Sequence, residues 1–323
     1  MKSFEYVAPK TLKEATALLS DTWGKTEILA GGTDLVTSLK QHITTPARVV
    51  SLKNISGLKA IKAERGGVRI GAMATLGEVS ENATILQHFP ALVGAATGIG
   101  SPQLLSTGTV GGDLCQRPRC WYFRNGYGLF GQDGDTSLVR EGDNRYHAIF
   151  GNDGPALFVS ASSLGPVLIA LGATFAVAGP DAKARTIEAA NFFQTPKTEN
   201  QRETALRPNE ILTEIHIPTK GLKNAIYEVR HRHGLDWPYV TAAVAFQPKG
   251  GAVSDARLVL GHVAPVPWPV PNAANVLNGA KIDPDTAARC GETAARGAKP
   301  LRGNAYKIQL VKAAVKRAVL AVA

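Results

Sequence analysis

The sequence contains few of the residues from which disulfide or metal frameworks are built. Only 3 of its 323 residues are cysteine and only 2 are methionine. Three cysteines are too few for a disulfide scaffold and fit a reducing compartment. No apolar run approaches the roughly 18–20 residues of a membrane span. The first residues, Met1-Lys-Ser-Phe-Glu-Tyr6, form no apolar signal segment, so we expect a cytoplasmic protein. The lack of a signal segment is also compatible with export of the protein together with a partner that carries the signal.

Several nucleotide and catalytic motifs are also missing. We find no G-x-x-x-x-G-K-[ST] loop, no G-x-G-x-x-G after a strand, no H-E-x-x-H and no G-x-S-x-G. This disfavours a Walker ATPase, a Rossmann nicotinamide site, a zinc protease and an α/β-hydrolase. The net charge of +10 comes from lysines and arginines scattered along the chain, without a long basic run. We therefore expect no nucleic-acid partner, and a basic surface that docks on an acidic subunit explains the charge equally well.

The hydrophobic patterning predicts an α+β protein of two domains. Pro, Gly and Lys interrupt the hydrophobic patterning near residues 218–223, so we expect a first domain over 1–220 and a smaller second domain over 221–323. Within the first domain we expect subdomains of about 1–55 and 56–220. We predict helices over 12–19, 35–40, 90–97, 164–171, 285–296 and 304–322, and strands over 26–30, 48–52, 67–72, 174–178, 210–217, 225–230, 239–247 and 256–262. The three strands after residue 221 predict an antiparallel sheet with helices packed on it.

Two capping boxes and one irregular stretch refine this prediction. Thr11 with Glu14, and Thr75 with Glu78, have the spacing at which each side chain caps the other's backbone N–H. Residues 98–155 are dense in glycine and show no regular pattern, and a long stretch of this kind is usually functional or disordered.

Two glycine pairs indicate a ligand site. The first lies in Leu29-Ala-Gly-Gly-Thr-Asp-Leu35, where a buried strand meets a helix, and the second lies in Gly108-Thr-Val-Gly-Gly-Asp-Leu114. Adjacent glycines let backbone N–H groups approach a diphosphate closely, and Thr33 and Asp34 supply polar contacts or a helix cap. Either motif alone is more often a tight turn. Together, in consecutive α/β units, they favour one ligand shared between them.

These motifs resemble those of a known family. A-G-G-T-D-L (30–35), followed by I-G-S-P-Q-L-L-S-T-G-T-V-G-G-D-L (99–114), is similar to the FAD-binding medium subunit of molybdenum hydroxylases, and so is the ending N-A-Y-K-I-Q-L-V-K (304–312). That family includes xanthine dehydrogenases, carbon monoxide dehydrogenases and aldehyde oxidoreductases. The resemblance implies a two-subdomain FAD-binding domain of the vanillyl-alcohol-oxidase (PCMH) type and the C-terminal domain typical of carbon monoxide dehydrogenase flavoproteins.

The resemblance also implies a set of cofactor-binding residues, and no catalytic or metal-ligating residue in this chain. It assigns to the FAD diphosphate and ribityl chain Ile28, Leu29, Ala30, Gly31, Gly32, Thr33, Asp34, Leu35, Thr109, Gly111, Gly112 and Asp113. Ile99 and Gly100 are expected along the same cleft, and Ser162 and Ser163 in a second polar cluster. Leu212 is expected to pack on the isoalloxazine.

Three positions depart from the family pattern. Asp113 stands where relatives usually have Asn, so we expect it either to bond a ribityl hydroxyl or to turn away from the diphosphate. Ser163 stands where many relatives have Asp. The run Tyr227-Glu-Val-Arg-His-Arg232 lacks the Lys that many relatives have, and no role of that Lys is carried over.

The insertion at about 115–153 resembles a segment that holds a [4Fe–4S] cluster in some relatives. Such a cluster usually needs four thiolates, but this segment has only Cys115 and Cys120, and Ala156 occupies an aligned ligand position. We therefore predict no cluster here and two reduced thiols. Consecutive Trp121, Tyr122 and Phe123 predict an exposed aromatic patch that faces a partner subunit. Separately, His231-x-His233 could share one strand face, but no third metal ligand is visible.

The function implied by the resemblance is electron transfer. Electrons would come from molybdopterin in a large partner subunit, through [2Fe–2S] clusters in a small partner subunit, to FAD here. The external acceptor could be NAD, a quinone, a cytochrome or dioxygen. One alternative is a stand-alone flavin oxidoreductase of the same superfamily with its own substrate cavity. A second is an assembly subunit without FAD, which the intact glycine pairs disfavour.

Overall fold

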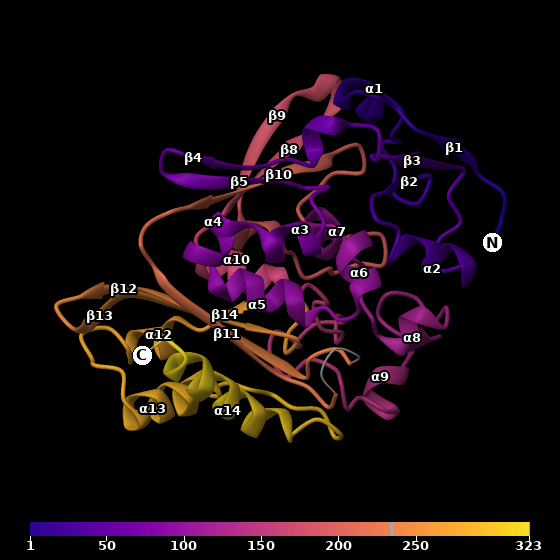
Figure 1. Cartoon of the computed structure of the whole chain (residues 1–323). Coiled ribbons are helices and arrows are strands. Elements are labelled where there is room, and N and C mark those ends of the chain that lie inside the picture. Colours follow the sequence, from indigo (N-terminus) through magenta and orange to yellow (C-terminus); the bar gives the residue numbers. More distant parts are fainter. Residues whose placement is uncertain (233–235, 323) are drawn as a thin grey trace.

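The computed structural model describes residues 1–232 and 236–322. Four sheets and the helices around them form the α+β fold that the sequence predicts (Figure 1). A small parallel sheet lies at the N-terminal end, a five-stranded sheet follows, and an antiparallel sheet covered by helices contains the C-terminal residues. A two-stranded hairpin lies in the insertion.

The N-terminal sheet is parallel, in the order β1-β3-β2. Its elements are β1 (Glu5–Val7), α1 (Leu12–Ala17), β2 (Thr26–Leu29), α2 (Leu35–Lys40) and β3 (Arg48–Ser51). Only half of the capping box predicted at α1 forms: Thr11 Oγ1 accepts the Glu14 N–H, whereas the Glu14 carboxylate accepts the N–H of Lys10 instead. Buried Ala15 and Val50 pack the helix on the sheet.

The five-stranded sheet has the order β4-β5-β10-β8-β9 and is antiparallel throughout. Its strands are β4 (Ile61–Glu64), β5 (Gly67–Gly71), β8 (Thr174–Ala178), β9 (Ala184–Glu188) and β10 (Ile211–Pro218). Its helices are α3 (Leu76–Glu81), α4 (Ala83–His88), α5 (Pro90–Gly98), α6 (Pro102–Thr107), α7 (Val110–Cys115), α10 (Leu164–Ala170) and α11 (Ala189–Phe192), with short turns of 3₁₀ helix at Ser56–Leu58 and Pro180–Ala182. The capping box at Thr75 and Glu78 is complete. The buried faces of these elements form the largest apolar core.

The insertion is more regular than the sequence indicates. The stretch 98–155 contains α6 and α7, and also α8 (Trp121–Arg124), the hairpin β6 (Gln132–Asp133) with β7 (Thr136–Ser137), and α9 (Leu138–Glu141). The insertion has its own apolar core, made of Phe123, Leu129, Phe130, Ala156 and Phe158.

The predicted exposed patch at Trp121–Phe123 is therefore wrong. Phe123 is buried in the core of the insertion, and Trp121 and Tyr122 are half-buried. The indole of Trp121 packs edge-on against the ring of Tyr146, and both Trp121 and Tyr122 contact the His147 ring. One short helix directs three consecutive side chains into different surroundings, and other rings of the insertion pack on two of them.

The C-terminal sheet is antiparallel, as predicted, in the order β11-β12-β13-β14. Its elements are β11 (Lys223–Val229), β12 (Val240–Lys249), β13 (Ala252–Gly261), β14 (Trp268–Pro269), α12 (Pro271–Asn275), α13 (Pro284–Ala294) and α14 (Lys307–Leu320). Cys290 is buried in α13, as expected for an apolar residue. Helices α5 and α10 lie between this sheet and the five-stranded sheet (Figure 1), so residues of both contribute to one core.

Candidate cofactor site

The two glycine pairs lie in segments that touch each other. The first loop joins β2 to α2. The second segment, residues 108–112, is the connection between α6 and α7 together with the first residues of α7, so Gly111 and Gly112 are helical, and we refer to this segment as the second loop. A Cβ atom added at Gly31 would lie 2.0 Å from the backbone oxygen of Thr107, just before the second loop. Gly32 has a φ of +86°, which L-residues rarely adopt. Glycine is therefore required at both positions of the first pair, for a close approach at one and for backbone conformation at the other.

The two loops differ in what their backbone amides do. Among the described residues, the N–H groups of residues 31–34 have no hydrogen-bond acceptor. In the second loop most amides are bonded within the protein: Gly111 N–H donates to Ala72 O at 2.8 Å, and Gly112 N–H donates to Thr109 Oγ1 at 3.0 Å. The first loop thus offers a run of four unbonded amides to a ligand, whereas in the second loop only the Thr109 N–H lacks an acceptor among the described residues. The second loop contributes close backbone approach and the Thr109 hydroxyl.

A cleft with two compartments runs along these loops. The first compartment, of about 440 Å³, is lined by the predicted residues Ile28, Ala30, Gly31, Gly32, Thr33, Asp34, Leu35, Thr109, Gly111, Gly112 and Leu212. The second, of about 250 Å³, is lined by the predicted residues Thr33, Asp34, Ile99, Thr109, Gly112, Asp113 and Ser163. The two compartments share lining residues and therefore adjoin each other. Leu29, Gly100 and Ser162 are not among the described lining residues of either compartment.

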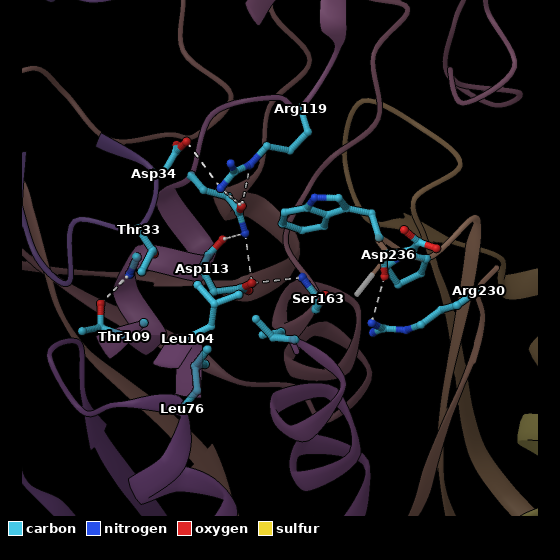
Figure 2. A pocket seen from close by; sticks show the side chains of 16 residues that line it. Thr33, Asp34, Leu76, Leu104, Thr109, Asp113, Arg119, Ser163, Arg230 and Asp236 are labelled. Atoms are coloured by element: carbon cyan, nitrogen blue, oxygen red, sulfur yellow. Dashed lines mark hydrogen bonds and ion pairs between the residues drawn. The ribbon is translucent and has the colours of Figure 1, made fainter. Parts of the chain in front are cut away.

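Asp113 turns toward the interior of the protein. Its carboxylate accepts hydrogen bonds from Ser162 Oγ at 2.6 Å, Leu164 N at 3.0 Å and Gln116 Nε2 at 3.0 Å (Figure 2 shows its neighbour Ser163). It therefore caps the start of α10. Burial raises the pKa of Asp113, and its hydrogen bonds with Ser162 and Leu164 oppose that rise. Because its oxygens are bonded inside the protein, the Asp113 carboxylate can lie close to the predicted diphosphate site without facing it.

Asp34 makes no side-chain cap on α2 and instead binds arginines of the insertion. Its Oδ1 accepts a hydrogen bond from Arg124 Nη2 at 2.8 Å and lies 3.4 Å from Arg119 Nη2 (Figure 2 shows Asp34 and Arg119). Its Oδ2 accepts a hydrogen bond from the backbone N–H of Arg117 at 2.9 Å. Arg124 also donates to Ser38 Oγ in α2. The insertion is thus fastened to the first glycine loop, and Arg117 and Arg119 line the cleft.

The sequence analysis did not assign these arginines to the site. The aromatic residues of the segment Cys115–Arg124 suggested a surface that faces a partner subunit, and the pairing with Asp34 joins residues more than eighty positions apart. The only signal in the sequence was the density of arginine in an insertion that directly follows the second glycine pair.

Each compartment of the cleft has a partly buried arginine paired with a glutamate. In the first compartment Arg202 lies over the Trp23 ring and its Nη2 is 3.1 Å from Glu27 Oε1. Burial raises the pKa of Glu27. In the second compartment the Arg230 guanidinium, bonded to Glu228 and to the backbone oxygen of Asp236, forms the wall (Figure 2). Neither pair was assigned from the sequence.

The cysteines lie in separate environments. Cys115 packs against the large core, and burial raises its pKa to about 12. Cys120 packs at the edge of the insertion core, and its Sγ lies 3.2 Å from His147 Nε2. Within residues 1–232 and 236–322, no three His, Cys, Asp or Glu side chains gather as a metal site. His233, half of the His231-x-His233 pattern, lies outside the described residues.

Comparisons with known proteins agree with this arrangement. The family model for the FAD binding domain in molybdopterin dehydrogenase matches residues 2–220, and the model for the CO dehydrogenase flavoprotein C-terminal domain matches residues 225–322. The chain is 29% identical to the aldehyde oxidoreductase FAD-binding subunit PaoB of Escherichia coli (strain K12), over 97% of this chain and 96% of that protein. It is also 29% identical to the carbon monoxide dehydrogenase medium chain of Hydrogenophaga pseudoflava, over 98% and 96%.

Solved structures show the same likeness. Carbon monoxide dehydrogenase from Hydrogenophaga pseudoflava superposes with a TM-score of 0.77 at 28% identity, covering 99% of this chain and 97% of that one. Quinoline 2-oxidoreductase from Pseudomonas putida 86 gives 0.77 at 25% identity, over 99% and 97%. No helix in the described part of the chain is both long enough and apolar enough to cross a membrane. The chain belongs to the FAD-binding medium subunits of the molybdenum hydroxylases, the oxidoreductase flavoproteins of xanthine dehydrogenase-like complexes.

Proposed function

We propose that FAD lies along the two-compartment cleft with its diphosphate at the first glycine loop. The observation that carries this placement is the row of unbonded amides at residues 31–34, held against the second loop by the Gly31–Thr107 contact. Amides of this kind bind phosphate oxygens. Arg117 lines the first compartment and adds positive charge for the diphosphate.

The isoalloxazine belongs in the second compartment. Leu76, Ile99, Leu104 and Trp237 supply apolar surface there for a flat ring system, and Arg230 supplies a positive charge at its wall. Leu212 lines the first compartment instead. In this placement Leu212 packs on the adenosine half of FAD. The sequence had suggested that Leu212 packs on the isoalloxazine.

The chain serves as the electron-transfer subunit of a molybdenum hydroxylase. Bound FAD supplies the redox chemistry that links [2Fe–2S] clusters of a small partner subunit, and molybdopterin of a large one, to an external acceptor such as NAD, a quinone, a cytochrome or dioxygen. The residues of this chain hold the diphosphate, cover the ring and exclude water. We assign no substrate-oxidising acid or base to them. The names of the relatives support a multi-subunit assembly: one is a medium chain and another an FAD-binding subunit.

Co-expression with the neighbouring genes tests this function. The chain is purified with and without the products of the genes beside its own, and absorption spectra, flavin content and iron content are measured. We expect a complex with two further subunits, one FAD per copy of this chain, and iron–sulfur absorption that disappears when the chain is purified alone. A yellow monomer that oxidises a small substrate without partners would instead establish the stand-alone flavin oxidoreductase.

A further inference from the structure

A second cavity lies beside the cofactor cleft, between the insertion and the C-terminal domain. Its volume is about 460 Å³. It shares Arg119, Asp236, Trp237 and Pro238 with the second compartment of the cleft. The Arg119 guanidinium lies 5.0 Å from the centre of the Trp237 ring, and this pair borders both spaces. We refer to it as the aromatic cavity. None of the functions proposed above uses it.

Aromatic rings form much of the wall of the aromatic cavity. The rings of Tyr146 and Tyr239 stack at 5.5 Å with an interplanar angle of 20°, and Trp121 meets Tyr146 edge-on at 5.3 Å. Tyr146 and Trp237 each remain 42% exposed although both line a hollow. Aromatic surface of this extent is usually covered in a soluble domain or contacts a ligand. The walls therefore suit a flat, apolar ring.

The charges around the aromatic cavity are mainly positive. The ammonium of Lys307 is buried and donates only to backbone oxygens, those of Tyr146 at 2.9 Å, His147 at 3.1 Å and His262 at 2.9 Å, without a carboxylate partner. Arg119 leaves Nη1 without an acceptor among the described residues. The carboxylate of Asp236 is already paired with Arg232.

The remaining ionisable groups do not cancel this positive potential. Burial lowers the pKa of His147 to about 4 and that of His262 to about 3, so both imidazoles are neutral near pH 7. Burial raises the pKa of Cys120, whose thiol therefore stays protonated. Burial also lowers the pKa of Lys307 to about 7, so its charge is only partly present near neutral pH, and Arg119 lies 3.4 Å from Asp34. Among the described residues, the cavity lining still has Arg119, Arg232 and Lys307 against the one carboxylate of Asp236, so an occupant with one negative charge is favoured.

We propose that the aromatic cavity binds a small aromatic carboxylate, with its ring against Tyr146 and Trp237 and its carboxylate toward Arg119. Lys307 acts at longer range, because its three N–H donors are already bonded. Since Arg119 and Trp237 also border the cofactor cleft, the bound carboxylate lies next to the place assigned to the flavin. The proposal stands on the aromatic cavity alone and does not depend on FAD binding.

Binding of matched acids and amides tests the proposal. 2-Naphthoate and benzoate, and their uncharged amides, are titrated into the full chain with and without FAD by calorimetry and by quenching of tryptophan fluorescence. We expect each carboxylate to bind at least tenfold more tightly than its amide. An amide that binds as tightly as its acid would overturn the assignment of an anion site. Absence of binding to the folded chain at millimolar concentrations would overturn the site itself.

A matched pair of tyrosine variants locates the bound ring. Tyr146→Ala removes one wall of the aromatic cavity and should weaken 2-naphthoate binding at least tenfold. Tyr127→Ala removes a tyrosine of similar exposure, 45%, which lies in the same insertion but is not a lining residue, and should leave affinity within twofold. Circular dichroism verifies that both variants are folded. Equal effects of the two substitutions would contradict the proposed location.

Discussion

Substitution of Gly32 should separate cofactor binding from folding. Residue 32 has a φ of +86°, and an L-residue in this conformation costs roughly 1–2 kcal/mol of conformational free energy. Without FAD, the loop of Gly32→Ala should relax to another conformation, so FAD binding must supply this free energy. An affinity loss of about 5- to 30-fold corresponds to that cost. In Gly32→Val the added methyl groups also crowd Leu29 and Val36, whose side chains lie 3.2 Å from the Cβ position. Overpacking adds about 1–3 kcal/mol, so FAD should weaken at least about thirtyfold and be lost on purification.

Gly66 provides the matched control for this experiment. It has a φ of +95° in the turn between β4 and β5, far from the cleft, and a Cβ there would meet nothing within 4 Å. Gly66→Ala should lower the melting temperature, yet keep wild-type FAD affinity. Flavin fluorescence titration and thermal melting measure the two quantities. Near-stoichiometric FAD in purified, folded Gly32→Val would refute the assignment of the first glycine loop.

Three further predictions concern the insertion and the buried acid beside it. Because burial raises the pKa of Asp113, its carboxylate costs stability at pH values above that raised pKa and costs none below pH ~3.8. The melting temperature of Asp113→Asn relative to that of the wild type should therefore be higher at pH 8 than at pH 4, and an equal difference at both pH values would contradict this. Arg124→Ala should expose the insertion to proteolysis and weaken FAD binding, because it removes the bonds to Asp34 and Ser38, whereas Arg140→Ala in the same insertion should do neither. The isolated subunit should contain no iron; about four irons per chain with absorption near 400 nm would show that the insertion holds a [4Fe–4S] cluster.

The sequence predicted features that are set by neighbouring residues. The helix start at Thr75 and Glu78 lies within one turn, and its capping box is complete. Glycine at position 32 permits the left-handed backbone found there, although the residue type alone does not dictate it. The structure also brings the two glycine pairs together, as their repeated pattern suggested.

The remaining features depend on contacts between distant residues. The contact of Arg124 with Asp34 spans ninety positions, and no periodicity marks it. Helix α8 has only four residues, too few to show a helical pattern, so its three aromatic side chains suggested an exposed surface. The inward turn of Asp113 depends on Ser162 and on the start of α10, which follow fifty residues later.

The position of β10 has a consequence for the order of events during synthesis. This strand lies in the middle of its sheet, with Ile215 paired to Ile70 of β5 on one side and to Phe175 of β8 on the other. Until residues 211–218 leave the ribosome, β5 and β8 each present an unpaired edge, and the cleft lacks the wall to which Leu212 belongs. About two thirds of the protein must therefore be made before a nascent chain can retain FAD, and truncations that end before β10 should yield aggregation-prone protein without flavin.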